Sequence, residues 1–219
     1  MNNDRPRMIL ALATEADDGF GVWERVKTLQ PEMFAAGPVE IKFAYFGAEG
    51  ALQTRPYIAT NWVTTADDMI ALMDRGRAGC VCGCYVEVGD ILEQALRETR
   101  QGPIQAVVIV GDCFRGDLDD AVATAKQLRA AGTSLFFFHQ GRSSPAEFTT
   151  LAEVTGGACF AFNPHVERVA ERLPGMLEAV THFAIGGPAA LEARGNECAD
   201  LLLEQMNAGR IAQGIPQTD

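Results

Sequence analysis

Two apolar runs near the middle of the chain constrain its fold most. Residues 106–110 read Ala-Val-Val-Ile-Val and residues 135–138 read Leu-Phe-Phe-Phe, so neither run alternates between apolar and polar side chains. A strand that is apolar on both faces is typical of the interior of a parallel sheet with helices on both sides. The two runs therefore predict central strands of a parallel sheet in an α/β protein.

Along the rest of the chain, apolar runs of strand length alternate with segments of helical period, as expected for a sheet wrapped by helices. After the first central strand, for example, Leu118, Val122 and Ala125 recur at spacings of four and three. The predicted strands are residues 8–13, 39–46, 106–110, 135–138 and 158–161, with residues 52–62 extended. The predicted helices are residues 21–34, 66–75, 86–100, 118–131, 146–155, 164–180 with a kink or break at Pro174, and 189–206.

Length and composition favour one large domain. The chain has 219 residues, of which 47% are hydrophobic and 21% charged, enough for a buried sheet covered by helices. We therefore expect a three-layer, Rossmann-like α/β domain with a mainly parallel central sheet flanked by helices. The net charge of −11, without a local cluster of basic residues, argues against nucleic acid as a partner.

The N-terminal segment predicts a cytoplasmic location. Its apolar run, residues 8–13, passes directly into an acidic stretch and is too short for a signal peptide. No stretch approaches the ~20 apolar residues that span a bilayer, so we expect no membrane association. Six cysteines without a secretion signal indicate free thiols in a reducing compartment.

The loops after the predicted strands are the first place to look for a functional site. In open parallel sheets, ligands bind beyond the carboxyl ends of the strands. This directs attention to residues 14–19, to the approach to Val86 and to residues 111–117.

Three short motifs in the second half of the chain carry a family resemblance. Residues 108–112 read Val-Ile-Val-Gly-Asp, residues 131–136 read Ala-Gly-Thr-Ser-Leu-Phe, and residues 151–157 read Leu-Ala-Glu-Val-Thr-Gly-Gly. In this order and spacing they resemble the second half of a bacterial von Willebrand factor A (vWA) domain, and the resemblance extends over residues 7–185. It implies the three-layer α/β fold and a role in protein–protein recognition.

The last predicted helix lies outside this resemblance. We expect residues 1–185 to form the vWA-like α/β domain, and residues 186–219 to form a C-terminal helix with a loose tail of about a dozen residues, packed on the same domain. Leu201, Leu202 and Met206 are the apolar stripe of that helix. The stripe could cover the flank of its own sheet or bind another protein.

The resemblance also implies a metal site, which this sequence alters. Family members hold a divalent cation at a metal-ion-dependent adhesion site (MIDAS), made by a DxSxS loop after the first strand, a Thr before the middle helix and an Asp after the central strand. Oxygen ligands of this kind suit Mg²⁺. The DxSxS positions correspond to Ala13, Glu15 and Asp17, while Val86 replaces the Thr and Asp112 retains the acid. Alanine and valine have no ligating side-chain atom, so we expect a degenerate MIDAS.

Four acidic residues would still meet at this edge and form a ligand- or partner-binding surface: Glu15, Asp17, Glu87 and Asp112. Two carboxylates ~6 Å apart repel by roughly 3 kcal/mol at an effective dielectric constant near 20. Three outcomes remain open. Glu15, Asp17 and Asp112 could bind Mg²⁺ or another divalent cation in a new geometry, one carboxyl group could hold a proton, or all could be solvated with no metal or other cofactor.

Cysteines and histidines provide weaker candidates for chemistry. The alternate spacing of Cys80, Cys82 and Cys84 would place three sulfur atoms on one face of an extended segment. These thiols could form a soft-metal or redox site, or they could be buried free thiols. His139 ends the second central strand, where it could approach Asp112 in a hydrolase or simply form a polar turn. The sequence contains no GxSxG, HExxH, GxxxxGK[ST] or GxGxxG motif.

Because no nucleophile, base and oxyanion set is apparent, we expect binding of another protein rather than catalysis, and assign no catalytic residue. The predicted function is a vWA-type protein–protein interaction module that lacks standard metal-dependent ligand binding. The alternatives are a metal-assisted hydrolase that uses Glu15, Asp17 and Asp112, and a cysteine-based metal or redox sensor.

Overall fold

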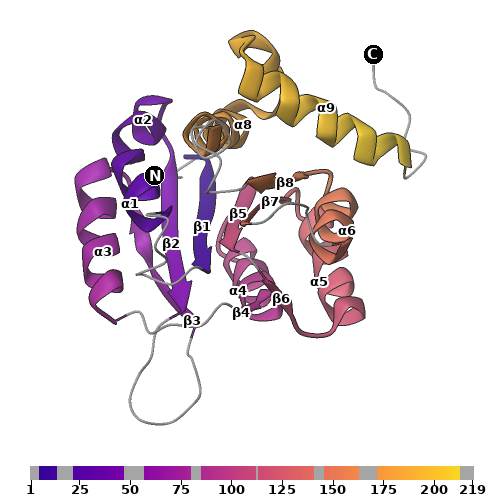
Figure 1. Ribbon diagram of the computed structural model, residues 1–219, viewed down its shortest axis with the longest axis horizontal. Helices are drawn as coiled ribbons and strands as arrows, with labels where there is room; N and C mark the ends of the chain where they lie inside the picture. Colours follow the sequence, from indigo (N-terminus) through magenta and orange to yellow (C-terminus); the bar gives the residue numbers. More distant parts are fainter. Residues whose placement is uncertain are drawn as a thin grey trace.

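A six-stranded sheet forms the centre of the molecule in the computed structural model, which describes residues 5–13, 22–46, 57–79, 85–111, 113–140, 146–162 and 172–212. The strand order is β3-β2-β1-β5-β7-β8, and only β3 is antiparallel to its neighbour (Figure 1). The strands are β1 (Arg7–Ala13), β2 (Glu40–Phe46), β3 (Tyr57–Val63), β5 (Ala106–Gly111), β7 (Ser134–Gln140) and β8 (Ala158–Phe162). The predicted central strands are confirmed, because β5 and β7 lie inside the sheet.

Helices cover both faces of the sheet (Figure 1). Side chains alternate along β1, so that Met8 and Leu10 join one apolar cluster and Ile9 and Ala11 join the other. The first cluster includes residues of α1 (Val22–Thr28), α2 (Gln30–Ala35), α3 (Ala66–Gly79), α8 (Arg172–Arg194) and α9 (Glu197–Ala212). The second includes residues of α4 (Val88–Thr99), α5 (Leu118–Ala130) and α6 (Ala146–Thr155). This is the predicted three-layer α/β architecture.

Two helix predictions in the first half are wrong in detail. The segment predicted as one helix over residues 21–34 is two helices, because Pro31 in the first turn of α2 has no N–H to continue α1. The segment predicted as a helix over residues 86–100 begins as strand β4 (Tyr85–Glu87), which pairs with β6 (Cys113–Arg115) in a separate two-stranded sheet. Periodicity could not reveal this pairing, since both strands have three residues.

The C-terminal helices also differ from the prediction. Of the helix predicted over residues 164–180, residues 164–171 lie outside the described residues, and Pro174 lies in the first turn of α8, where its missing N–H has no helical partner. The helix is interrupted at Gly186 and Gly187 instead (φ −140° and 67°), where the sequence predicted a separation. The single helix predicted over residues 189–206 is wrong, since α8 ends at Arg194 and a second interruption at Gly195 (φ 54°) precedes α9. Residues 208–212 are helical rather than loose, and residues 213–219 lie outside the described part.

Helix α9 packs along the edge strand β8 and beside α6 (Figure 1). Leu202 and Met206 are buried in the first apolar cluster, and Leu201 is half-buried. The backbone N–H of Cys159 in β8 donates to Oε1 of Gln205, 3.1 Å away, so a side chain replaces a strand partner there. The apolar stripe of α9 therefore packs on its own sheet. None of the helices within the described ranges combines the length and apolar content that crossing a membrane requires.

Candidate functional site

Three neighbouring parallel strands end in register at the carboxyl edge of the sheet. The Cα of Ala13, the last residue of β1, pairs with that of Gly111, the last residue of β5. Gly111 pairs in turn with His139 near the end of β7. Adjacent strands are about 4.8 Å apart, so these three backbones form one compact row. This edge lies at the bottom of Figure 1, where β1 ends.

The small β4–β6 sheet brings a fourth segment to this edge. Tyr85 pairs with Cys113 and Val86 pairs with Phe114. Since Cys113 follows Gly111 by two residues, the backbone of β4 lies beside the chain that continues from β5. Residues 13 and 86 replace family ligands in the resemblance, and their backbones thus pair with Gly111 and Phe114, one on each side of residue 112 in the sequence.

The acidic candidates themselves are mostly beyond the described ranges. Glu15, Asp17 and Asp112 lie outside the described residues. Glu87 is the last residue of β4, and its Cα pairs with that of Arg115. Within the described part of the chain, no group of three or more His, Cys, Asp or Glu side chains is arranged to hold a metal ion. The predicted ligand set, with or without a cation, therefore stays a prediction.

Two helices that begin at this edge contribute acidic residues that were not among the predicted site residues. Asp90 is in the first turn of α4, and Asp119 and Asp120 are in the first turn of α5; all three are exposed. The carboxylate of Asp117 caps α5 by accepting from the N–H groups of Asp119 (2.8 Å) and Asp120 (3.1 Å). The Asp-Leu-Asp-Asp sequence was the available signal, because helix N-termini favour acidic side chains.

The backbone of His139 lies at the carboxyl edge of the sheet, and its side chain is buried. The residue is 8% exposed, and its ring centroid lies 6.0 Å from that of Phe148 in α6. His139 thus remains within β7 rather than starting a polar turn. His182 lies in α8, and His165 is outside the described residues.

The predicted cysteine cluster, Cys80, Cys82 and Cys84, lies outside the described residues. Cys159 in β8 is buried and Cys198 in α9 is half-buried. Burial raises the pKa of the Cys198 thiol, with the charge of Glu197 adding to the effect, which disfavours a reactive thiolate there.

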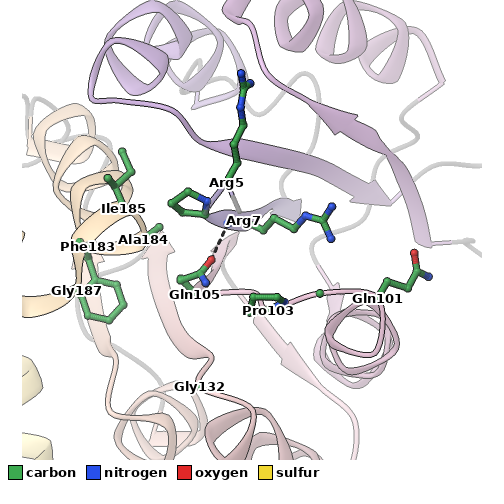
Figure 2. Close-up of a pocket in the computed structure, with 13 residues that line it drawn as sticks. Arg5, Arg7, Gln101, Pro103, Gln105, Gly132, Phe183, Ala184, Ile185 and Gly187 are labelled. Carbon is green, nitrogen blue, oxygen red and sulfur yellow. Dashed lines mark hydrogen bonds between the residues drawn. The ribbon is translucent and has the colours of Figure 1, made fainter. Parts of the chain in front are cut away.

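A cleft of about 600 Å³ lies at the opposite, amino edge of the sheet, between the start of β1 and the interruption in α8 (Figure 2). Phe183 and Ile185 form an apolar wall, and the N–H of Arg7 donates to Oε1 of Gln105 at 2.6 Å. Figure 2 shows the side chains of Arg5 and Arg7 extending in different directions, both away from that wall. Although its volume suits a small ligand, its polar groups do not converge as they do in ligand sites.

Comparisons with known proteins identify the fold. No protein-family model matches the chain, and no curated protein matches it in sequence. Among solved structures, the SpRpn10 VWA domain is similar over 77% of this chain and 93% of its own, with a TM-score of 0.56 and 13% identity. A von Willebrand factor type A protein from Catenulispora acidiphila is similar over 83% of this chain, with a TM-score of 0.57 and 13% identity.

A third similar structure is proximal thread matrix protein 1 from the mussel byssus, solved with a zinc-occupied MIDAS motif. It is similar over 83% of this chain, with a TM-score of 0.55 and 15% identity. This chain spans only 43% of the Catenulispora chain and 48% of the mussel chain. Identities this low establish architecture and leave the metal site of this chain untested. By its fold, the chain is a vWA-like domain.

Proposed function

We propose that this chain is a vWA-type protein-binding module that contacts its partner through the carboxyl edge of the sheet, without standard Mg²⁺ coordination. The register of Ala13 with Gly111 is the observation that most supports this proposal. It sets an alanine, which has no side-chain ligand atom, next to the residue that precedes Asp112. Val86, at the position that the resemblance gives to the Thr ligand, likewise has no side-chain oxygen, which also supports binding without ordinary Mg²⁺ coordination.

The charge of this edge suggests the chemistry of the partner. Four described carboxylates, Asp90, Asp117, Asp119 and Asp120, are exposed at the beginnings of α4 and α5. Glu15, Asp17, Glu87 and Asp112 would add to them. We therefore propose a protein partner whose contact surface is rich in Lys and Arg, because complementary charge accelerates encounter and excludes wrong partners.

We also propose that residues 1–185 form the vWA-like unit and that residues 186–219 are an addition packed on the same domain. The burial of Leu202 and Met206 and the bond from Cys159 to Gln205 support the packing. In this arrangement the C-terminal helix stabilises the module and leaves the carboxyl edge to the partner.

A charge-matched capture experiment tests the proposed surface. The immobilised chain is compared with an edge variant, Asp90→Asn/Asp119→Asn/Asp120→Asn, that keeps the Asp117 cap. The control, Asp67→Asn/Asp200→Asn/Glu204→Gln, removes the same number of exposed charges elsewhere: Asp67 is in the first turn of α3, and the other two are in α9. Partners are quantified by mass spectrometry from the native cell in the presence of EDTA.

We expect a partner that is captured by the wild type and the control, lost with the edge variant, and weakened as salt rises. Equal capture by all three proteins would contradict the proposed surface. Capture that occurs without EDTA and disappears in its presence would contradict the proposal that the partner binds without a metal ion. Calorimetric titration with Mg²⁺, Mn²⁺ and Ca²⁺ provides a second measurement, and heat that Asp112→Asn removes would show a cation site.

A further inference from the structure

The two parts of α8 are joined by side chains across the interruption at Gly186 and Gly187. Arg194, at the end of the helix, donates through Nη2 to Oε1 of Glu178 at 2.5 Å. Its Nη1 is 2.6 Å from Nε2 of His182. Glu178 and His182 are both in the part before the interruption, so one guanidinium fixes the segment after it.

The contact with Arg194 determines the protonation state of His182. A guanidinium has only N–H donors, so Nε2 of His182 has to accept with its lone pair, and the ring has to be neutral. Burial lowers the pKa of His182, and the charge of Arg194 lowers it further, while Glu178 partly opposes them. Nε2 of His182 lies 3.9 Å from Oε1 of Glu178, one helical turn away, within reach of an ion pair once the ring is charged.

The elements packed against α8 carry other charged groups, none of which contributes to the shift in the pKa of His182. In α9, Glu197 pairs with Arg172 at 2.7 Å, and the neighbouring Cys198 thiol is neutral. From α2, Glu32 lines a small cavity together with Glu178. In β1 the only charged residue, Arg7, is paired with Glu40, and β5 has no titratable side chain. Arg194 and Glu178 are therefore the two groups that act on His182.

We propose that Glu178, His182 and Arg194 form a latch that acid opens. A proton from solvent binds Nε2 of His182, which removes the acceptor for Arg194 and places two cations side by side. Glu178 then pairs with the His182 cation within the same helical turn, and Arg194 loses both partners. The segment after the interruption is released from the first part of α8, and α9, which follows it, loses one of its restraints on β8.

The direction of the pH dependence follows from the lowered pKa of His182. The closed latch excludes a proton that the open latch accepts, so the latch is closed above the ordinary histidine pKa of about 6.5 and opens as the pH falls below it. Because α9 also buries Leu202 and Met206, we expect local loosening rather than global unfolding.

Hydrogen–deuterium exchange tests the latch on the full chain. After correction for intrinsic rates, amides in residues 188–212 should exchange severalfold faster at about pH 5 than at about pH 7.5, because protonation of His182 favours the open latch. Amides in α5 should not change. His182→Gln retains an acceptor without a charge and should abolish the response, whereas Arg194→Gln should exchange rapidly at both pH values. Glu93→Gln, which breaks an exposed pair in α4, should retain the full response.

An undiminished response in His182→Gln, or no response in the wild type, would overturn the latch. A second measurement needs no variant. In a pH titration by NMR, the His182 ring and the Gly195 amide should share one midpoint below 6.5. A midpoint above that value, or a Gly195 amide that does not follow the ring, would overturn the proposal independently.

Discussion

Lys42 and Glu98 form an ion pair inside the protein, between β2 and the C-terminal end of α4. The Nζ of Lys42 is 2.5 Å from Oε1 of Glu98, and the two side chains are 10% and 7% exposed. Trp62 donates from Nε1 to Oε2 of Glu98 at 3.3 Å, and Gln94 donates to Oε1 at 2.7 Å. Lys42 also lies over the Trp62 ring, 4.9 Å from its centroid. These contacts fix α4 against β2 and β3, and α4 begins at the proposed binding edge.

Glu98→Gln should reduce the free energy of unfolding by about 3 kcal/mol, because it leaves the ammonium of Lys42 buried without a counterion. Glu93→Gln on the same helix is the matched control. Glu93 pairs with Arg97 at 3.5 Å in an exposed position, so this change should cost less than about 0.5 kcal/mol. Urea denaturation measures the free energy of unfolding of both variants. Equal losses would show that the buried ion pair stabilises the protein no more than the exposed pair does.

The stability from Glu98 should depend on pH. Burial raises the pKa of this carboxyl group, but hydrogen bonds from Lys42, Trp62 and Gln94 and the charge of Lys42 outweigh burial and lower it below 4.5. Its contribution is therefore complete above 4.5 and is lost as the pH falls through the lower pKa of the folded state. The difference between the wild type and Glu98→Gln, measured by urea denaturation, should shrink under those acidic conditions. A constant difference would contradict this assignment.

Gly157 should not tolerate a side chain. A Cβ at this position would lie 1.9 Å from the backbone oxygen of Leu135, so Gly157→Ala has to separate α6 from β7. We expect a loss of about 3 kcal/mol or more in thermal or urea unfolding. Gly89→Ala is the control, since nothing lies within 4 Å of its added Cβ in α4, and it should stabilise the protein by up to about 1 kcal/mol.

The packing of α9 can be tested at Leu202. This side chain is fully buried, and Leu202→Ala should cost about 3 kcal/mol through lost apolar contact and the cavity left behind. Glu204→Ala, two residues away and exposed, should change stability by less than about 0.5 kcal/mol. If Leu202→Ala were equally mild, α9 would not be part of the domain core in solution.

The register of Ala13 with Gly111 leads to a gain-of-function prediction. Ala13→Asp with Val86→Thr introduces side-chain oxygens at two positions whose backbones pair with Gly111 and Phe114, on either side of Asp112 in the sequence. With a Kd of about 1 mM, about 10 mM Mg²⁺ should then raise the free energy of unfolding by about 1.4 kcal/mol. The wild type should show no such stabilisation. Thermal unfolding with and without Mg²⁺ measures both proteins, and a Mg²⁺ effect in the wild type would contradict the degenerate site.

The sequence by itself determined the sheet and its layers. Residues 106–110 and 135–138 are apolar at every position, and strands buried on both faces require this, so β5 and β7 were predictable. The family motifs led to the same architecture, and the strand-end rule located the edge where Ala13, Gly111 and His139 meet. Chemistry at that edge was predictable only as residue types, because the sequence around three of its acidic candidates has no periodic pattern from which contacts could be predicted.

Only the tertiary structure decided which distant residues touch. The β4–β6 pairing, the bond from Cys159 to Gln205 and the contact between His182 and Arg194 have no local pattern. Hydrophobic periodicity indicates which positions of a segment are buried, and this pattern is present in the segment's own sequence. Which partner a buried or polar group meets depends on how segments pack after the chain has folded, and that information is distributed over the whole molecule.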